Sequence, residues 1–258
     1  MNEKQIKSAY RVRKKAMKLR QKKSRAELRK RYDDKIEDCY RASGKQRVKN
    51  PPKRPLLQEI GNSVTHGLGA VFAIVSLVLM LVLSENGAER ISAVIYSVGM
   101  LVMFSVSCLY HAFRYGSAVK RLFRRFDYSS IYVMIGATFA PVLLSYIGGT
   151  FGIVFFIIQW VVIAVGISLV GVFGPSRLRF IHIPLYVILG WSALMLMPYM
   201  IDGAFSMAMW IFAGGVVYSI GIIPYAVKYK SSHFIWHFFV LAGAVVQWIG
   251  IFITIYVS

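Results

Sequence analysis

Seven long apolar stretches constrain the fold of this chain more than any other feature. A membrane-spanning helix needs about 20 predominantly apolar residues to cross a hydrocarbon core of about 30 Å. Continuous apolarity, without alternation at every second residue, favours helices over a transmembrane β-barrel. The sequence therefore predicts an all-α integral membrane protein, a seven-transmembrane helix bundle. The expected spans are approximately 64–83, 91–110, 128–147, 151–173, 180–200, 205–227 and 234–257.

Charge divides the chain into two parts of different composition. Residues 1–54 hold 21 of the 31 Lys and Arg residues but only 6 of the 11 Asp and Glu residues. We interpret them as a basic tail, helical or disordered, and residues 55–258 as the membrane domain. Lys, Arg, Ala, Leu and Glu favour a helix from about residue 3 to residue 40. The tail lacks the apolar core of a signal peptide, so we expect it to be retained.

The distribution of cations among the loops predicts the orientation. Basic residues recur in loops 112–126, 174–179 and 228–233, whereas the alternate loops carry only Arg90, beside two glutamates, and Asp202. By the positive-inside rule, the N-terminus is cytoplasmic, the C-terminus is outside, and the protein is a multi-pass component of the plasma membrane.

The surplus charge of the tail has two interpretations. It forms a solvated, partly helical surface, or it binds anionic lipid of the inner leaflet, where each Lys or Arg near the surface contributes about 1 kcal/mol. No recognition motif accompanies the charge, so we expect no binding to nucleic acid.

Polar side chains gather at the predicted cytoplasmic ends of the spans, although ionisable groups at membrane depth are costly and usually face a bundle interior. His233 and His237 are four residues apart, so both rings lie on one helix face. Ser107 and His111 have the same spacing. At the first span, Glu59, Asn62 and His66 have the spacing i, i+3, i+7, which also places them on one helix face. The set comprises Glu59, Asn62, His66, Ser107, His111, Asp127, His233 and His237.

Three imidazoles and a carboxylate at one depth predict a metal site. Three histidines with one open position are typical of catalytic zinc, whereas structural zinc has four protein ligands. Imidazole also suits other divalent transition metals. Asp127 would orient or deprotonate a water that zinc activates, or serve as a fourth ligand. Ser107 would donate to a developing oxyanion, and Glu59, Asn62 and His66 would contact the imidazoles and hold them in place.

Structural interpretations remain open for the same residues. The histidines of the last span would bond to headgroups or loop carbonyls, and Asp127 would cap a helix or pair with an arginine. Ser107 would pack or bond to a backbone carbonyl. Glu59 would cap the first span, His66 would be a core histidine, and His182 is expected to be interfacial or packing.

These residues also carry a resemblance to a known family. The runs from Glu59 to His66, from Ser107 to His111, from Asp127 to Ser130 and from His233 to His237 resemble bacterial hemolysin III proteins. These proteins belong with the progestin and adipoQ receptors and, more distantly, the alkaline ceramidases. The resemblance covers about residues 55–258 and implies a seven-helix bundle with zinc at its inner face. His111, His233 and His237 would be the ligands, with Asp127 holding the zinc or its water and Ser107 beside them.

The leading hypothesis is a metal-dependent hydrolase of an amide- or ester-linked lipid that enters laterally between helices, since related receptors and ceramidases are thought to hydrolyse ceramide-like lipids. One alternative is a receptor-like or regulatory membrane protein with structural zinc. A second, implied by the hemolysin name, is a pore-forming cytolysin.

Overall fold

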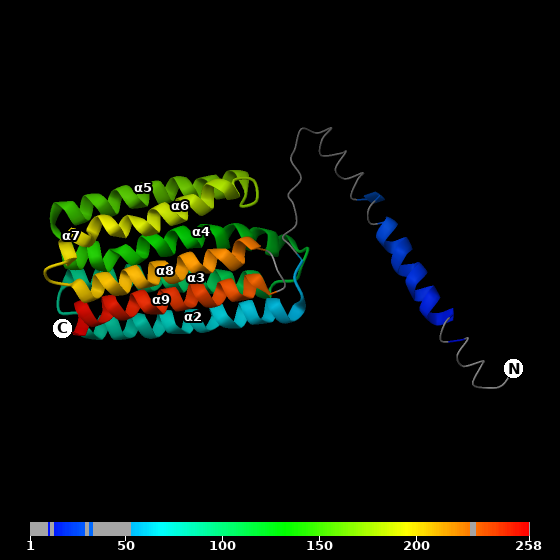
Figure 1. Cartoon of the computed structure of the whole chain (residues 1–258), viewed down its shortest axis with the longest axis horizontal. Helices are drawn as coiled ribbons and strands as arrows, with labels where there is room; N and C mark the ends of the chain where they lie inside the picture. Colours follow the sequence, from blue (N-terminus) through cyan, green and yellow to red (C-terminus); the bar gives the residue numbers. More distant parts are fainter. Residues whose placement is uncertain (1–9, 11–12, 29–30, 33–52, 228–230, 258) are drawn as a thin grey trace. The chain divides into compact units, whose positions relative to one another are not determined.

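The computed structural model describes residues 10, 13–28, 31–32, 53–227 and 231–257. The chain divides into two compact units, Met1–Lys49 and Asn50–Ser258. In the first unit the described residues, chiefly 13–28, are helical and exposed, while the rest of the helix expected at 3–40 falls outside the described ranges. The second unit holds the other helices (Figure 1).

The described part of the chain contains helices and no β-strand, as the apolar pattern predicts. Seven helical spans are long and apolar enough to cross a membrane, which confirms the seven-helix, all-α fold. The helices are α2 (Leu56–Leu83), α3 (Gly87–Ala112), α4 (Ala118–Ala140) with the π-helix η1 (Pro141–Ile147), α5 (Gly149–Phe173), α6 (Arg179–Trp191) with the 3₁₀-helix η2 (Ser192–Leu196), α7 (Met197–Met200), α8 (Phe205–Val227), and α9 (Ser232–Phe252) with the π-helix η3 (Ile253–Val257).

Short polar and glycine-rich segments set the helix boundaries. The Asn86 side chain accepts a hydrogen bond from the backbone N–H of Glu89 at 3.0 Å and caps the start of α3, as expected for asparagine at a helix N-terminus. Gly148 and Gly149 have φ values of 61° and 59°, which other residues rarely adopt. They allow the chain to reverse abruptly between η1 and α5.

The third transmembrane helix is longer than the apolar pattern indicates. We expected a loop over 112–126 and a span from residue 128, but α4 begins at Ala118. The Ser117 hydroxyl accepts from the backbone N–H of Lys120 at 3.1 Å and caps the helix. The following Lys, Arg and Leu residues favour helix intrinsically, so the helix continues beyond the apolar stretch, and apolarity alone misses its first turns.

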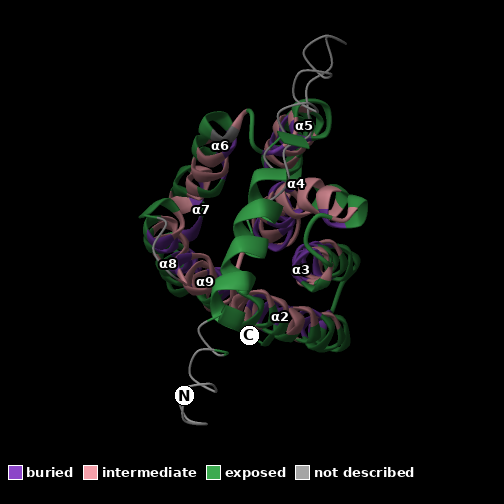
Figure 2. Ribbon diagram, turned by 90° about the vertical axis from the view of Figure 1, so that its right-hand side faces the viewer, coloured by how far each residue is buried: buried purple, intermediate pink, exposed green. Residues whose placement is uncertain are grey.

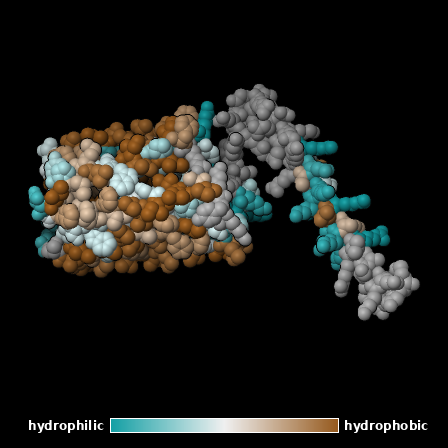
Figure 3. Space-filling model, in the orientation of Figure 1, coloured by the Kyte–Doolittle hydropathy of each residue, from teal (hydrophilic) through white to brown (hydrophobic). Residues whose placement is uncertain are grey.

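Small residues bring the helices of the bundle close together. A Cβ atom on Gly99 of α3 would collide with Ala137 of α4, and one on Gly214 of α8 would collide with Gln247 of α9. Such close approach is typical of membrane helices. The outer surface is largely apolar (Figure 3), with side chains such as Leu57, 82% exposed. That surface suits contact with membrane lipids, because lipid tails are the solvent there.

The helices surround an internal cavity. Figure 2 shows α2, α3, α4, α6, α8 and α9 around the centre, with α5 outside α4. The cavity has a volume of about 820 Å³ and is lined by all of these except α5. We call the end of the bundle where α2, α4, α6 and α9 begin the site end (Figure 1).

Candidate metal centre

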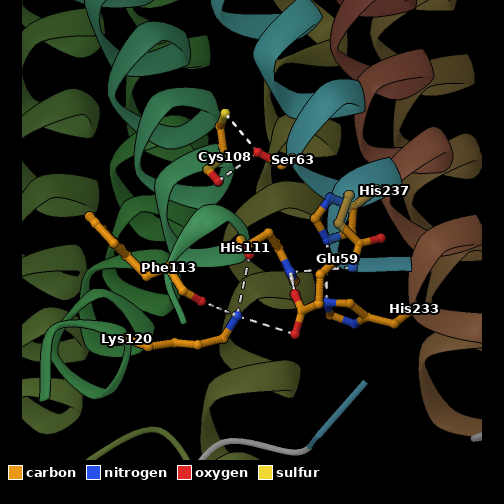
Figure 4. A network of polar contacts seen from close by, with 9 residues as sticks. Glu59, Ser63, Cys108, His111, Phe113, Lys120, His233 and His237 are labelled. Atoms are coloured by element: carbon orange, nitrogen blue, oxygen red, sulfur yellow. Dashed lines mark hydrogen bonds and ion pairs between the residues drawn. The ribbon is translucent and has the colours of Figure 1, made fainter. Parts of the chain in front are cut away.

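The structure brings the eight candidate residues together at the site end. Glu59, Asn62 and His66 come from the start of α2, and Ser107 and His111 from the last turns of α3. The others are Asp127 of α4, and His233 and His237 of the first turns of α9. The end of α3 and the start of α9 thus face each other across the start of α2 (Figure 4).

Three histidines form a group with the spacing of a metal site. Ligand atoms of His111, His233 and His237 all lie within 4.8 Å of one another. The Nε2 atoms of His233 and His237 are 3.2 Å apart, because a spacing of four residues places both rings on one face of α9. His111 and His237 are each 2% exposed, so the group lies inside the protein.

The donor geometry fits a tetrahedral ion. Zinc binds histidine nitrogen at about 2.0–2.1 Å, so two nitrogens of a tetrahedral site lie about 3.3 Å apart. The separation of 3.2 Å within α9 matches this value. Nε2 of His111 is buried and has no hydrogen-bond partner among the described residues. Three imidazoles with ligand atoms within 4.8 Å of one another are a suitable ligand set for a divalent transition metal.

A carboxylate orients the ring of His111. Its Nδ1 lies 2.6 Å from Oε2 of Glu59 and 3.3 Å from the amide of Asn62. A carboxylate accepts, so Nδ1 donates to it, which leaves Nε2 as the nitrogen available to an ion. Carboxylate–histidine pairs of this kind fix the tautomer and increase the basicity of metal ligands. Because Nδ1 is a donor, the side-chain oxygen of Asn62 is the amide atom suited to face it.

Lys120 extends this arrangement and was not among the residues predicted from sequence. Its ammonium lies 3.2 Å from Oε1 of Glu59 and donates to the carbonyl of Phe113 at 3.1 Å (Figure 4). The side chain is 1% exposed. The sequence placed Lys120 among loop cations, and its charge gave no sign of burial. The only local signal in the sequence was Ser117, three residues earlier, since serine is favoured as the residue that caps the start of a helix. It indicates that Lys120 belongs to a helix and not to a loop.

Asp127 and Ser107 form a second pair beside the histidines. The Ser107 hydroxyl and the side chain of His111 both interact with the carboxylate of Asp127. Asp127 is not part of the group of donor atoms within 4.8 Å. Both side chains line the cavity. Their arrangement suits a role toward a bound water or substrate better than a role as a direct ligand.

His66 contacts the histidine group through its ring. Its centroid is 3.9 Å from that of His237, and it meets Phe104 edge-on at 5.2 Å. The side chain is 3% exposed and lines the cavity. Neither ring nitrogen has a hydrogen-bond partner in the described residues, so His66 packs against a candidate ligand without bonding to it.

His182 lies apart from this group and is fully buried. Its Nδ1 is 2.9 Å from the Tyr132 hydroxyl. It is a packing residue between α6 and α4, one of the two roles expected for it.

The cavity connects the histidine group to the bundle interior. At the site end its wall contains His233, His237 and Asp127, and farther in it contains apolar residues such as Phe139 and Leu196. Large apolar pockets with a few convergent polar groups are typical of ligand sites. The arrangement therefore joins a candidate metal centre to a space that suits an apolar ligand.

Comparison with known proteins places this site within a family. The family model described as "Haemolysin-III related" matches residues 55–248, a range that contains all eight candidate residues. The "Hemolysin-3 homolog" of Bacillus subtilis (strain 168) is 32% identical over 195 residues, which cover 72% of this chain and 89% of that protein. "Hemolysin-3" of Bacillus cereus is 31% identical over 195 residues, covering 72% and 87%. The human "Monocyte to macrophage differentiation factor" is 31% identical over 214 residues, covering 78% and 86%. The chain belongs to the haemolysin-III related family of multi-pass membrane proteins.

Proposed function

We propose that this protein is a zinc-dependent hydrolase of an amide or ester bond in a membrane lipid, acting at the cytoplasmic face of the plasma membrane. The observation that carries the proposal is the three-histidine group beside a cavity of about 820 Å³. A structural zinc site is closed by four protein ligands, whereas a catalytic one keeps a position for water or substrate. The donor set and the adjoining cavity support the open type.

His111, His233 and His237 would hold the ion. When bound, zinc polarises a carbonyl oxygen and supplies a water that ionises near neutral pH. Glu59 would keep the His111 ring in the tautomer that presents Nε2, since its carboxylate accepts from Nδ1 at 2.6 Å. Another divalent transition metal would use the same nitrogens.

Asp127 and Ser107 would act on the reacting groups. The Asp127 carboxylate would accept a proton from the attacking water and return it to the leaving group. The Ser107 hydroxyl, which interacts with that carboxylate, would keep the Asp127 side chain in place. Alternatively, it would donate to the carbonyl oxygen of the substrate as negative charge develops on that oxygen. His66 would shape the wall beside His237.

The substrate would be a lipid that enters laterally. The span Phe180–Met200, which includes nearly all of α6, is the least buried of the seven. Only 17% of its most apolar stretch is buried inside the protein. Its residues Ile183, Tyr186 and Val187 nevertheless line the cavity. A thinly packed helix between cavity and lipid provides a route by which an acyl chain reaches the centre without crossing water.

The basic tail would bind anionic lipid of the inner leaflet. Residues 13–28 form an exposed helix rich in Lys and Arg, and such segments are attracted to anionic headgroups. With the N-terminus in the cytoplasm, the tail would be on the side of the inner leaflet. Deletion of residues 1–49 should reduce the amount of detergent-free protein that sediments together with anionic vesicles. The zinc content of the protein should stay unchanged.

Elemental analysis and lipid turnover test the proposal. Purified protein in lipid nanodiscs should contain zinc in a ratio of one ion per chain, and it should release a fatty acid from a lipid amide or ester in a panel resolved by mass spectrometry. Asp127→Asn should lower release by about 10²–10⁴-fold with zinc retained. His182→Gln is the matched control, since it alters a buried histidine outside the centre and should retain both properties. Zinc with no turnover on any amide or ester would favour the receptor-like alternative, and dye release from protein-containing liposomes would favour the cytolysin.

A further inference from the structure

The mouth of the cavity carries an excess of positive charge. Among the residues that the structure describes, the charged side chains that line the cavity are Lys53, Arg54, Arg124 and Asp127, so three cations accompany one anion there. Glu59 and Lys120, the nearest other charged pair, neutralise each other at 3.2 Å. A divalent ion at the histidine group would add to the positive excess. A neutral ligand in the mouth would leave this charge uncompensated.

Arg54 differs from the other cations of the cavity wall because part of its guanidinium group is buried. Its guanidinium hydrogen-bonds to the Tyr110 hydroxyl and is within electrostatic range of Asp127, His111 and His233. Its Nη1 atom is buried and has no hydrogen-bond partner in the described part of the chain. An unpaired buried donor on a charged group is unfavourable, so the side chain is poised for an acceptor in the cavity.

Cations elsewhere at the site end have ordinary structural roles. Arg121 donates to the carbonyl of Gly116 at 2.8 Å, and Arg125 donates to that of Gly171 at 3.0 Å. Neither lines the cavity. The positive-inside rule accounts for such residues, but it does not account for an arginine directed into the bundle. Arg54 also precedes the range 55–248 that the family model matches, so the family match does not extend to it.

Beyond the mouth, the cavity wall becomes apolar. The stretch of α9 between His237 and Gln247, both of which line it, spans ten residues or about 15 Å at 1.5 Å per residue. The inner part is closed by Leu196 and Met200, each 1% exposed. A site with cations at one end and an apolar chamber at the other matches a molecule with an anionic head and an alkyl chain.

We propose that the cavity binds an anionic amphiphile, with its phosphate or carboxylate head held by Arg54, assisted by Lys53 and Arg124, and its alkyl chain in the apolar chamber. The planar guanidinium binds such groups through two parallel hydrogen bonds. The inference rests on the proposed function in taking this ligand as the substrate class, and it predicts selection of acidic over neutral or zwitterionic lipids.

Ligand binding to zinc-free protein tests the inference separately from catalysis. The protein is placed in phosphatidylcholine nanodiscs, stripped with a chelator, and titrated with dodecyl phosphate or with dodecylphosphocholine of the same chain length. Trp191 and Trp236 line the cavity and report binding by fluorescence. Dodecyl phosphate should bind at least about tenfold more tightly, the scale of a charge-assisted hydrogen bond. Without metal, coordination of the head by zinc does not contribute.

Arg54→Gln should remove most of this preference, and Arg124→Gln a smaller part. Arg114→Gln is the matched control, because Arg114 is exposed at the same end and is not in the cavity wall; it should keep the full preference. Equal binding of the two amphiphiles, or an unchanged preference in Arg54→Gln, would overturn the proposal. Competition by inorganic phosphate as strong as that by dodecyl phosphate would also overturn it, since the ligand would then be a free anion. If Arg54→Gln does not fold, Arg124→Gln tests the proposal, and an unchanged preference for dodecyl phosphate in that variant would overturn it.

A failure of the proposed function leaves this result intact. Protein without zinc or without hydrolysis still shows the anion preference if the head-group site exists. Conversely, an active zinc hydrolase that does not discriminate between the two probes refutes the head-group site alone.

Discussion

Toward the end of the bundle away from the centre, several buried polar side chains bond to one another, whereas many of the unpaired buried polar atoms lie at the site end. Trp248 donates to the Ser76 hydroxyl at 2.6 Å, and that hydroxyl lies 3.1 Å from Ser97. Ser92 and Tyr256 pair similarly at 2.9 Å. Ten buried side-chain atoms lack a hydrogen-bond partner within the described ranges, and five of them belong to Arg54, His66, His111 and His237. Closed polar pairs hold helices together, and the open atoms at the site end mark the region available to a ligand.

Removal of a histidine from the centre is expected to have the largest effect. His233→Ala should lose the zinc that the wild-type protein retains after dialysis, because two imidazoles do not make a tight site. Elemental analysis measures the loss, with His182→Gln as the control. Unchanged zinc in His233→Ala would remove the basis for treating the site end as a metal centre.

Asp127→Asn should separate chemistry from metal binding. Loss of a general base typically lowers turnover by about 10²–10⁴-fold, while the three histidine ligands remain. Release of fatty acid from the lipid found in the panel is compared with zinc content on the same sample. If zinc and turnover fall together, Asp127 is a ligand, the other role considered from sequence.

The sequence predicted the fold and the composition of the site more fully than its supporting contacts. Apolar length gave seven spans, and helical spacing together with topology placed Glu59, Asn62 and His66 near His111, which the structure brings together. Lys120 and Arg54 were missed, because pattern reasoning treats cations beside a span as orientation signals. Only three-dimensional packing distinguishes an arginine in a loop from one whose Nη1 is buried over the histidines.

Glu59→Gln tests whether the carboxylate orients His111. The amide retains the shape of the side chain but weakens the contact at 2.6 Å, and loss of such a partner typically lowers metal affinity by about 10–100-fold. Competition with a zinc-binding chromophore measures the affinity. Thermal unfolding of the zinc-free protein is the control, since a merely structural glutamate would alter unfolding without altering zinc affinity.

Lys120→Met completes that test. Lys120 contacts His111 at its backbone carbonyl, at 3.4 Å, and acts on the ring of this candidate ligand through Glu59. Lys120→Met should therefore lower zinc affinity in the same direction as Glu59→Gln but by less. A larger effect than that of Glu59→Gln would show that the end of α3, and not the carboxylate, positions the ring.

The smallest effect is expected at the closed polar pairs. Ser76→Ala removes the acceptor of Trp248 and the contact with Ser97. Buried hydrogen bonds between membrane helices contribute only about 0.6 kcal/mol on average, because the unfolded state in the membrane also finds partners. The variant should unfold at a slightly lower temperature and bind zinc and dodecyl phosphate as the wild type does. Loss of either ligand in Ser76→Ala would mean that the two ends are coupled, and the division between a closed, structural end and an open, ligand-binding end would be wrong.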